Sequence, residues 1–315
     1  MNHDAAATEA AAQTEALMAE AATTQAEGIQ DQPAEGFDLG SMLMGEVENA
    51  PYFQYPGGRI DLPQWDPILH LGPFPVDLSP TKYVVWMVIA AVLVLLTFLL
   101  IGRAFRRLES DQAPSGFANA VEAMVVFFRD QVVRANIGKD GDRFAPFILT
   151  LFFFILYMNL LGLIPWGISS TASISVTLAL AFLAFLWIEI AGFMKLGPAG
   201  YARTIFYAPS GLHPVGQALM LIIMTPVEAL GKLTKPFALM IRLFANMTAG
   251  KILILALVGL IFVFADLAVG RWGIAGGAVG MAAAITLLKV FISFLQAFIF
   301  AMLTAVFIGL IRHAH

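Results

Sequence analysis

Several apolar runs in this chain are long enough to cross a lipid bilayer, and they constrain the fold more than any other feature. Residues 83–101 contain no charged side chain. At about 1.5 Å per residue, a helix of that length crosses the roughly 30 Å of hydrocarbon in a bilayer. Of all residues, 59% are hydrophobic and 13% are charged, which is too little polarity to cover a water-soluble domain. We therefore predict an integral membrane protein.

The predicted fold class is an all-α polytopic membrane protein with about five membrane-embedded helices and one amphipathic interfacial helix. Residues 117–137 repeat valine and phenylalanine at helical spacing and place charged residues elsewhere, a pattern typical of a helix at the membrane interface. The embedded helices are predicted at residues 83–101, 144–164, 173–193, 213–265 and 282–311. Together they form one membrane domain over residues 81–315.

The segment 213–265 is too long to stand upright in a bilayer. Some fifty residues make a helix of roughly 75 Å, more than twice the hydrocarbon thickness. Either the chain breaks near Pro226 or Pro236, or the helix is strongly tilted. The glycine-rich segment 270–280 is predicted as a turn or as a loosely packed start of the last helix, which is also long and tilted.

Basic residues at the helix ends predict the orientation. Arg103, Arg106 and Arg107 follow the first span, while Arg312 and His313 follow the last. Clusters of Lys and Arg beside a span favour the cytoplasmic side. We expect the N-terminus outside, the C-terminus in the cytoplasm, and a location in an energy-coupling membrane such as the bacterial plasma membrane.

The residues before the first span have a different composition. Residues 1–50 are rich in Ala, Glu, Gln and Thr and are predicted as a disordered acidic tail. Residues 51–80 contain many Gly and Pro and are predicted as a loop-rich lead-in on the outer side. The chain has no cysteine and five scattered histidines, so we expect no metal site and no cofactor. Its basic residues lie mostly beside apolar runs, so we expect membrane lipid and no nucleic acid as a partner.

Four polar side chains share one face of the long fourth helix. Glu228, Lys235, Arg242 and Asn246 are separated by steps of seven, seven and four residues, which return to nearly the same azimuth. An ionisable residue at membrane depth is costly unless it faces protein or water, and it therefore marks a function. Glu228 and Lys235 either pair, extend to an interface or serve ion movement. Arg242 has no charged neighbour along the chain.

The last helix has a similar polar face. Thr286, Lys289, Ser293 and Gln296 follow one another at steps of three, four and three, so they share one side of the helix. Two apolar helices with one polar stripe each satisfy those groups by facing each other or by lining a hydrated passage. The alternative is a polar seam that only holds the two helices together.

Four motifs resemble one known family. They are YMNLLGLIP at 157–165, SVTL at 175–178, KPFALMIRLFANMTAG at 235–250 and FLQAFIFAMLT at 294–304. They resemble subunit a of the F-type ATP synthases, from about Asp77 to the C-terminus. The resemblance implies a non-catalytic stator beside a ring of c subunits, assembled with the b subunit of the peripheral stalk and the rest of the complex. Two offset aqueous half-channels carry protons, or in some members sodium ions, to and from the ring carboxylates.

The resemblance also implies roles for single residues. Arg242 corresponds to the essential arginine of the family, and Asn246 and Gln296 correspond to polar positions near it. Glu228 corresponds to an acid that lines the cytoplasmic access path. Asn159 lies near the outer end of its span, where it is expected to help the outer entry.

Two lysines depart from the family pattern. Lys251 and Lys289 occupy the positions where the family generally pairs a carboxylate with a histidine along the outer half-channel. Two ammonium groups cannot relay protons in that way, so either one is neutral or an acid such as Asp266 lies between them. We expect the outer passage to depend more on water and Gln296 than on a titrating relay. Glu189 either lines the inner path or pairs with Lys195.

Two other functions fit parts of the pattern. A secondary transporter would use Arg242 as a mid-membrane anion-binding site, but such folds are commonly built from repeats, which this sequence lacks. An intramembrane enzyme needs a nucleophile beside a base, a metal-ligand cluster or a phosphate-binding loop, and none stands out here.

Overall fold

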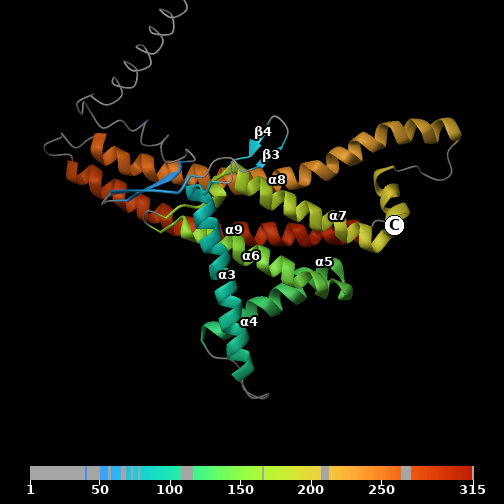
Figure 1. Ribbon diagram of the computed structural model, residues 1–315, viewed down its shortest axis with the longest axis horizontal. Helices are drawn as coiled ribbons and strands as arrows, with labels where there is room; N and C mark the ends of the chain where they lie inside the picture. The colour runs from blue at the N-terminus through green and yellow to red at the C-terminus, as the bar shows by residue number, and fades with distance from the viewer. Residues whose placement is uncertain are drawn as a thin grey trace, which may run out of the picture.

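The computed structural model describes residues 40, 50–55, 58–64, 69–71, 74–76, 79–107, 116–164, 167–206, 213–263 and 271–313. Within these residues, five helical segments are long and apolar enough to cross a membrane. They contain α3 (Lys82–Arg107), α6 (Ala145–Leu161), α7 (Ile174–Ile205), α8 (Pro214–Val263) and α9 (Arg271–His313). The predicted all-α polytopic fold is confirmed. Figure 1 shows α8 and α9 lying across the direction of α3, as two long, strongly tilted helices should.

The predicted helix at 117–137 is present as a continuous chain of helical turns. It comprises α4 (Phe117–Phe127), a π-helix (Phe128–Arg134) and α5 (Ala135–Ile137). Arg134 holds the end of this rod against the following 3₁₀ turn, because its guanidinium contacts Asp142 at 2.6 Å and Asp130 at 2.9 Å. Because these ion pairs are exposed, they add little stability, and their main effect is to hold the orientation of the helix end.

The lead-in to α3 contains two antiparallel β-hairpins that its Gly and Pro content did not predict. The first joins β1 (Tyr52–Tyr55) to β2 (Gly58–Asp61), and the second joins β3 (Leu69–Leu71) to β4 (Phe74–Val76). Each strand has only three or four residues, so no period-two pattern can develop. The predicted acidic tail lies outside the described residues, apart from two positions.

The long helix α8 continues through both of its prolines. Pro226 and Pro236 lie inside the helix, so the predicted alternative of a chain break is wrong and the tilted helix is correct. A proline removes one backbone hydrogen bond and kinks a helix without always ending it. The segment 271–280 is helical as well, so the predicted turn is wrong there. It is a loosely packed helix start, with Trp272 75% exposed.

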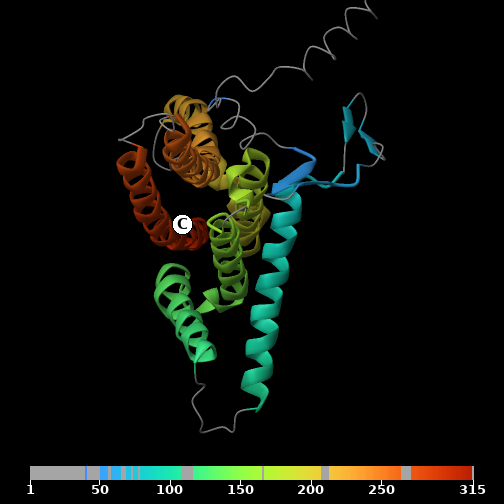
Figure 2. The same cartoon turned by 90° about the vertical axis from the view of Figure 1, so that its left-hand side faces the viewer.

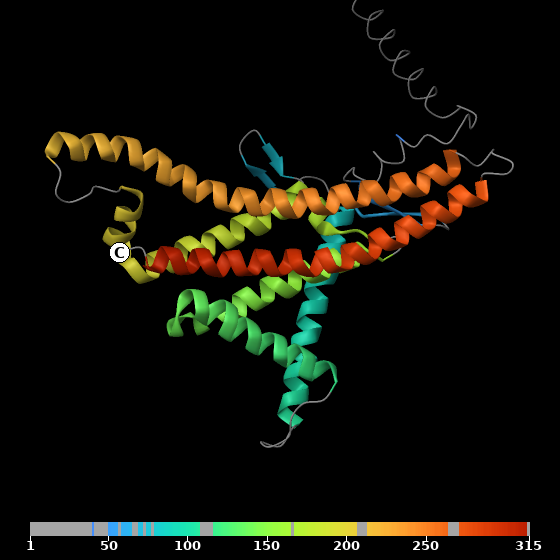
Figure 3. The ribbon, with the colours of Figure 1, turned by 180° about the vertical axis from the view of Figure 1, so that it is seen from behind.

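Helices α8 and α9 form an antiparallel hairpin whose two arms lie side by side near their connection (Figure 3). Three alanines let α9 approach its other neighbours. Ala297, Ala301 and Ala305 are fully buried at steps of four residues, which forms a small-residue stripe along one face. Between membrane helices, close van der Waals packing at such stripes replaces the hydrophobic effect as the main attraction.

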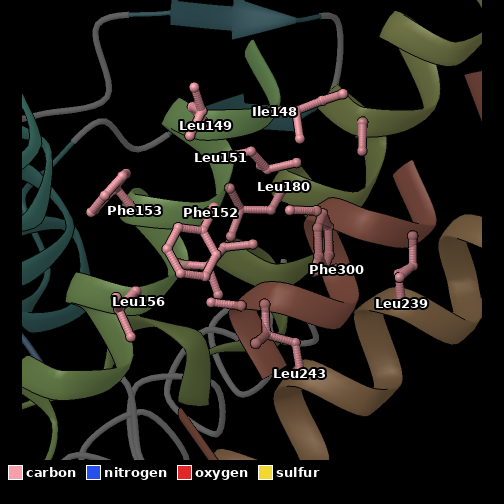
Figure 4. Packing of buried hydrophobic residues seen from close by; sticks show 14 of the residues in the cluster. Ile148, Leu149, Leu151, Phe152, Phe153, Leu156, Leu180, Leu239, Leu243 and Phe300 are labelled. Atoms are coloured by element: carbon pink, nitrogen blue, oxygen red, sulfur yellow. The ribbon is translucent and has the colours of Figure 1, made fainter. Parts of the chain in front are cut away.

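The core is centred on α6. Figure 4 shows Phe152 of α6 among neighbours that include Leu180 of α7 and Phe300 of α9, while Leu239 and Leu243 of α8 close one side. These five side chains are between 0% and 5% exposed. The arrangement anchors the middle of α8 and α9, which positions the polar groups on these helices.

Candidate functional site

Arg242 lies near the middle of α8 on a face that the other described residues leave open. Its side chain is exposed, whereas Leu239 and Leu243 on the neighbouring face are buried. Among the described residues, no hydrogen bond or ion pair reaches its guanidinium. One turn later, the amide nitrogen Nδ2 of Asn246 is buried and has no hydrogen-bond partner in the part of the chain that the structure describes. Arg242 is a permanent cation in the middle of an apolar helix, and the described residues supply no anion for it.

Two contacts set the register between α8 and α9. The Lys235 ammonium lies 5.2 Å from the centre of the Phe307 ring. Farther along α8, a Cβ atom at Gly250 would lie 2.8 Å from Cε of Lys289. The side chain of Lys289 therefore packs directly against the backbone of α8 at Gly250. Arg242 lies between these two contacts. In antiparallel helices, the part of α9 between Lys289 and Phe307, which contains Gln296, therefore faces the part of α8 that contains Arg242.

The polar residues of α9 share one face, as predicted. Lys289, Ser293 and Gln296 are buried, at 8%, 0% and 6% exposure, whereas Leu288 and Phe291 are more than half exposed. The hydroxyl of Ser293 has no hydrogen-bond partner in the described structure. A buried hydroxyl without a partner is costly, and an internal water satisfies it. The face is therefore suited to hold water.

Thr286 does not use its hydroxyl toward this face. Its Oγ1 donates 2.8 Å to the carbonyl of Ala282 in the same helix, a local bond that competes with other partners. Thr286 therefore belongs to the stripe by position but contributes no free polar group to it.

A cavity of about 220 Å³ lies where α7, α8 and α9 meet, on the side of Arg242 toward the start of α8. Its wall includes Glu189 from α7 and Glu228, Lys232 and Lys235 from α8. The sequence predicted Glu228 on the inner path and left Glu189 either on that path or paired with Lys195, and the structure brings both acids to the same cavity. Glu228 precedes Arg242 by 14 residues, or about 21 Å of helix.

Glu189 pairs with Lys232 in this cavity. Lys232 Nζ lies 3.4 Å from Oε2 of Glu189 and donates 3.2 Å to Oγ1 of Thr204. Both charged side chains are less than one fifth exposed. The predicted alternative pair between Glu189 and Lys195 is wrong, because Lys195 Nζ contacts Asp140 at 3.7 Å.

A kink in α7 completes this cluster. Gly197 has φ of 66° inside the helix, in the left-handed region where a glycine costs least. The kink turns the second half of α7 so that the hydroxyl of Tyr201 donates to the Glu189 carboxylate. The ammonium of Lys232 also lies 4.4 Å from the centre of the Tyr201 ring, a cation–π distance.

A second polar cluster lies beyond Arg242 in the direction of the end of α8. Asn159 of α6 is fully buried, and its Oδ1 accepts a 2.6 Å hydrogen bond from Thr171, which shares a 2.7 Å bond with Ser169. Nδ2 of Asn159 has no partner in the described residues. Thr171 lies in a 3₁₀ turn (Ser170–Ala172), and Thr248 of α8 donates 3.4 Å to the carbonyl of Ala172. The cluster therefore adjoins α8 after Arg242.

The two unusual lysines lie on this same side. The Lys289 ammonium packs over Gly250, and Lys251 is close enough to act on its charge. The acid predicted between them, Asp266, lies outside the described residues. Lys289 is buried, at 8% exposure, whereas Lys251 is partly exposed.

Sequence reasoning missed three contributors to these clusters. Lys232 follows Glu228 by four residues, the same step that separates Arg242 from Asn246, and could have been found by that spacing. Tyr201 and Thr171 carry no comparable signal, because single hydroxyl groups at helix ends and in turns are common. Only the tertiary structure joins them to Glu189 and Asn159.

Comparisons with known proteins point to one family. A family model described as "ATP synthase A chain" matches residues 84–309. The chain is 42% identical over 294 residues to "ATP synthase subunit a" of Chlorobium phaeobacteroides (strain BS1), covering 91% of this chain and 82% of that protein. It is 44% identical over 255 residues to the protein of the same description from Chloroherpeton thalassium (strain ATCC 35110 / GB-78), covering 81% and 71%. It is 40% identical over 288 residues to "ATP synthase subunit a" of Anaeromyxobacter dehalogenans (strain 2CP-C), covering 87% of this chain and 71% of that protein.

Proposed function

The chain belongs to the ATP synthase A chain family, and from this premise we propose that it is the stator whose two offset passages carry protons to and from the carboxylates of a c-ring. It is an integral membrane subunit of the F-type complex and not the catalytic part. We further propose that it contacts the c-ring subunits and the b subunit, and that it resides in a bacterial plasma membrane with its C-terminus in the cytoplasm.

The observation that supports the proposal is the order of polar groups along α8. The cavity with Glu189 and Glu228 lies before Arg242, and the cluster with Asn159 and Thr248 lies after it. Arg242 lies between them and is exposed in the described structure. Two half-channels with a barrier between them require one polar region on each side of a cation. The order of groups along α8 fits this requirement.

The barrier follows from the chemistry of arginine. A ring carboxylate crosses lipid as the neutral acid, because the ionised form is too costly there. The acid loses its proton where water accepts the proton and a cation stabilises the carboxylate, and Arg242 is that cation. Guanidinium keeps its proton, so it blocks direct exchange between the passages. Each proton that passes yields about 2.3 kcal/mol per 100 mV, which rotation of the ring can capture.

The two passages differ in their titratable groups. The inner one contains Glu228 and the Glu189–Lys232 pair around a cavity of about 220 Å³. The outer one is built from Asn159 and Ser293, each with one unpartnered polar group in the described residues, with Gln296 nearby. We propose that water held by these groups conducts protons on the outer side.

The test is proton transport by the whole ATP synthase in membrane vesicles. Arg242→Lys should abolish ATP-driven acidification, because lysine can lose its proton and no longer separates the passages. Arg203→Lys, at an exposed arginine in the last turn of α7, is the matched control and should leave pumping unchanged. Retention of normal pumping by Arg242→Lys would refute the proposed role.

A second variant tests the outer passage. If water and amides conduct there, Lys289→Ala should leave measurable proton flux, whereas Arg242→Ala should leave no coupled flux. Passive proton conductance of vesicles stripped of the soluble head measures the flux through Lys289→Ala, and ATP-driven acidification by the whole complex measures the coupled flux of Arg242→Ala. Complete loss of flux in Lys289→Ala would show that this lysine takes part in a relay.

A further inference from the structure

A cavity of about 750 Å³ lies between α3, α4, the π-helix and α6, and none of the proposed proton-path residues lines it. Most of its wall is apolar, with Val94 and Phe98 from α3 and Leu149 from α6. Figure 2 shows that α3 and α4 stand apart along the lower half of α3. The α3 side is held by α6, through the Phe98–Phe153 ring contact at 5.3 Å.

Three charged residues line the same cavity: Glu122 of α4, Arg129 of the π-helix and Asp142. Asp142 accepts two hydrogen bonds from Arg134, at 2.7 and 2.6 Å, so it is already satisfied. Nε of Arg129 donates 3.1 Å to Asp130, and its other N–H groups have no hydrogen-bond partner among the described residues.

Glu122 is the unusual member of this group. Its side chain is half-buried on the cavity wall, and among the described residues it has no hydrogen bond or ion-pair partner. The wall therefore offers one free carboxylate and a guanidinium with free N–H donors beside an apolar space. A carboxylate in such surroundings is stabilised by a cation with N–H donors.

These features match one lipid chemistry. A guanidinium binds phosphate oxygens in a bidentate manner, and an ammonium group supplies the donors that a carboxylate accepts. The part of α3 that lines the cavity runs from residue 91 to residue 105, about 21 Å at about 1.5 Å per residue. The hydrocarbon of one leaflet is about 15 Å thick, so the cavity is long enough for one acyl chain.

A further membrane helix fits the cavity less well. A helix about 10 Å wide that crosses about 30 Å of hydrocarbon occupies on the order of 2,400 Å³. The cavity holds about a third of that volume. A helix from another subunit would cover the opening but would leave the interior empty.

We propose that the cavity binds one phospholipid with a primary-amine headgroup, its acyl chain between α3 and α6, its phosphate on Arg129 and its ammonium on Glu122. The lipid fills the space that the side chains leave open and fastens α4 to α3. This site is independent of the proton path, because Arg242 and Glu228 do not line the cavity.

A photoreactive amino acid at Ala91 tests the occupant in the whole ATP synthase. Ala91 lines the cavity, whereas Val92 is 47% exposed on α3 and does not line it. After irradiation of membranes, the mass of the subunit should show an adduct of one amine-bearing phospholipid at Ala91. The same label at Val92 should capture lipids in their bulk proportions. A protein adduct at Ala91, or a lipid adduct of bulk composition there, would overturn the proposal.

Two variants test the lining residues by native mass spectrometry of the intact complex in mild detergent. Ala91→Trp should remove one retained aminophospholipid per complex, and the matched Val92→Trp should retain it. Glu122→Lys should exchange it for a phospholipid with an anionic headgroup and no amine, because lysine repels ammonium and attracts phosphate. Retention of the same lipid in both Ala91→Trp and Glu122→Lys would contradict the assigned site.

Discussion

Replacement of Lys232 by methionine tests whether the Glu189–Lys232 pair is an energetic unit of the inner cavity. Loss of one partner from a buried ion pair costs about 3–5 kcal/mol, whereas exposed pairs are worth about 0–1 kcal/mol. The two side chains are 13% and 16% exposed, close to the buried case. Tyr201 still donates to Glu189, and the cavity admits water. We therefore expect Lys232→Met to destabilise the subunit by about 2–3 kcal/mol.

Thermal unfolding of the purified complex in detergent measures this effect. For a chain of this size, about 2–3 kcal/mol corresponds to a fall in Tm of roughly 3–5 °C. Lys195→Met is the matched control, because its pair with Asp140 is 49% and 70% exposed at 3.7 Å. It should change stability by less than about 1 kcal/mol.

The double variant Glu189→Gln with Lys232→Met separates charge from packing. It removes both charges, so most of the stability lost in Lys232→Met should return. With the single variant Glu189→Gln completing the cycle, the coupling energy should be about 1–2 kcal/mol. If the double variant is less stable than Lys232→Met alone, the pair is not coupled and our account of the cavity is wrong. Proton pumping should fall in the double variant if Glu189 also serves the inner passage.

Two further predictions concern the junction of α9 with the helical rod at 117–137. A Cβ at Gly309 would lie 2.1 Å from the carbonyl oxygen of Asn136. Gly309→Ala should therefore separate α9 from α5 and cost about 1–3 kcal/mol in the same melting assay, whereas Gly280→Ala meets nothing within 4 Å and should be neutral or stabilising. Hydrogen bonding to Arg129, followed by the charges of Arg129 and Arg134, outweighs desolvation and lowers the pKa of Asp130. Its stabilisation is present above the usual pKa near 4 and is lost as pH falls through the lowered value. Amide exchange over residues 128–134, corrected for intrinsic rates, should rise in acid for wild type, and Asp130→Asn should show that faster exchange already at neutral pH.

The long helices could be predicted because the bilayer imposes one requirement on them. A segment must satisfy its own backbone and present apolar side chains for about 30 Å, so length and hydropathy are sufficient. The same periodicity placed Lys289, Ser293 and Gln296 on one face, which is buried as expected. The hairpins at 52–61 and 69–76 are too short and too rich in turn residues for such a signal.

Pairing between distant residues was beyond the reach of periodicity. A helical repeat gives the azimuth of Glu189 but not its partner, and the nearest basic residue along the chain, Lys195, was a wrong choice. The correct partner, Lys232, lies on another helix. The kink at Gly197 then adds Tyr201, and only the three-dimensional path of α7 shows this.

The exposure of Arg242 has a different meaning from that of an ordinary surface arginine. Leu239 and Leu243 beside it on α8 pack into the core, while the exposed side chains near it include the apolar Phe237, at 58% exposure, and Ile241, at 39% exposure. A guanidinium on such a face is too costly to leave in lipid. Among the described residues the charge of Arg242 has no anionic partner, and under the proposed function a carboxylate of the c-ring supplies one. This explains why the sequence could identify the residue while the described structure supplies no partner for it.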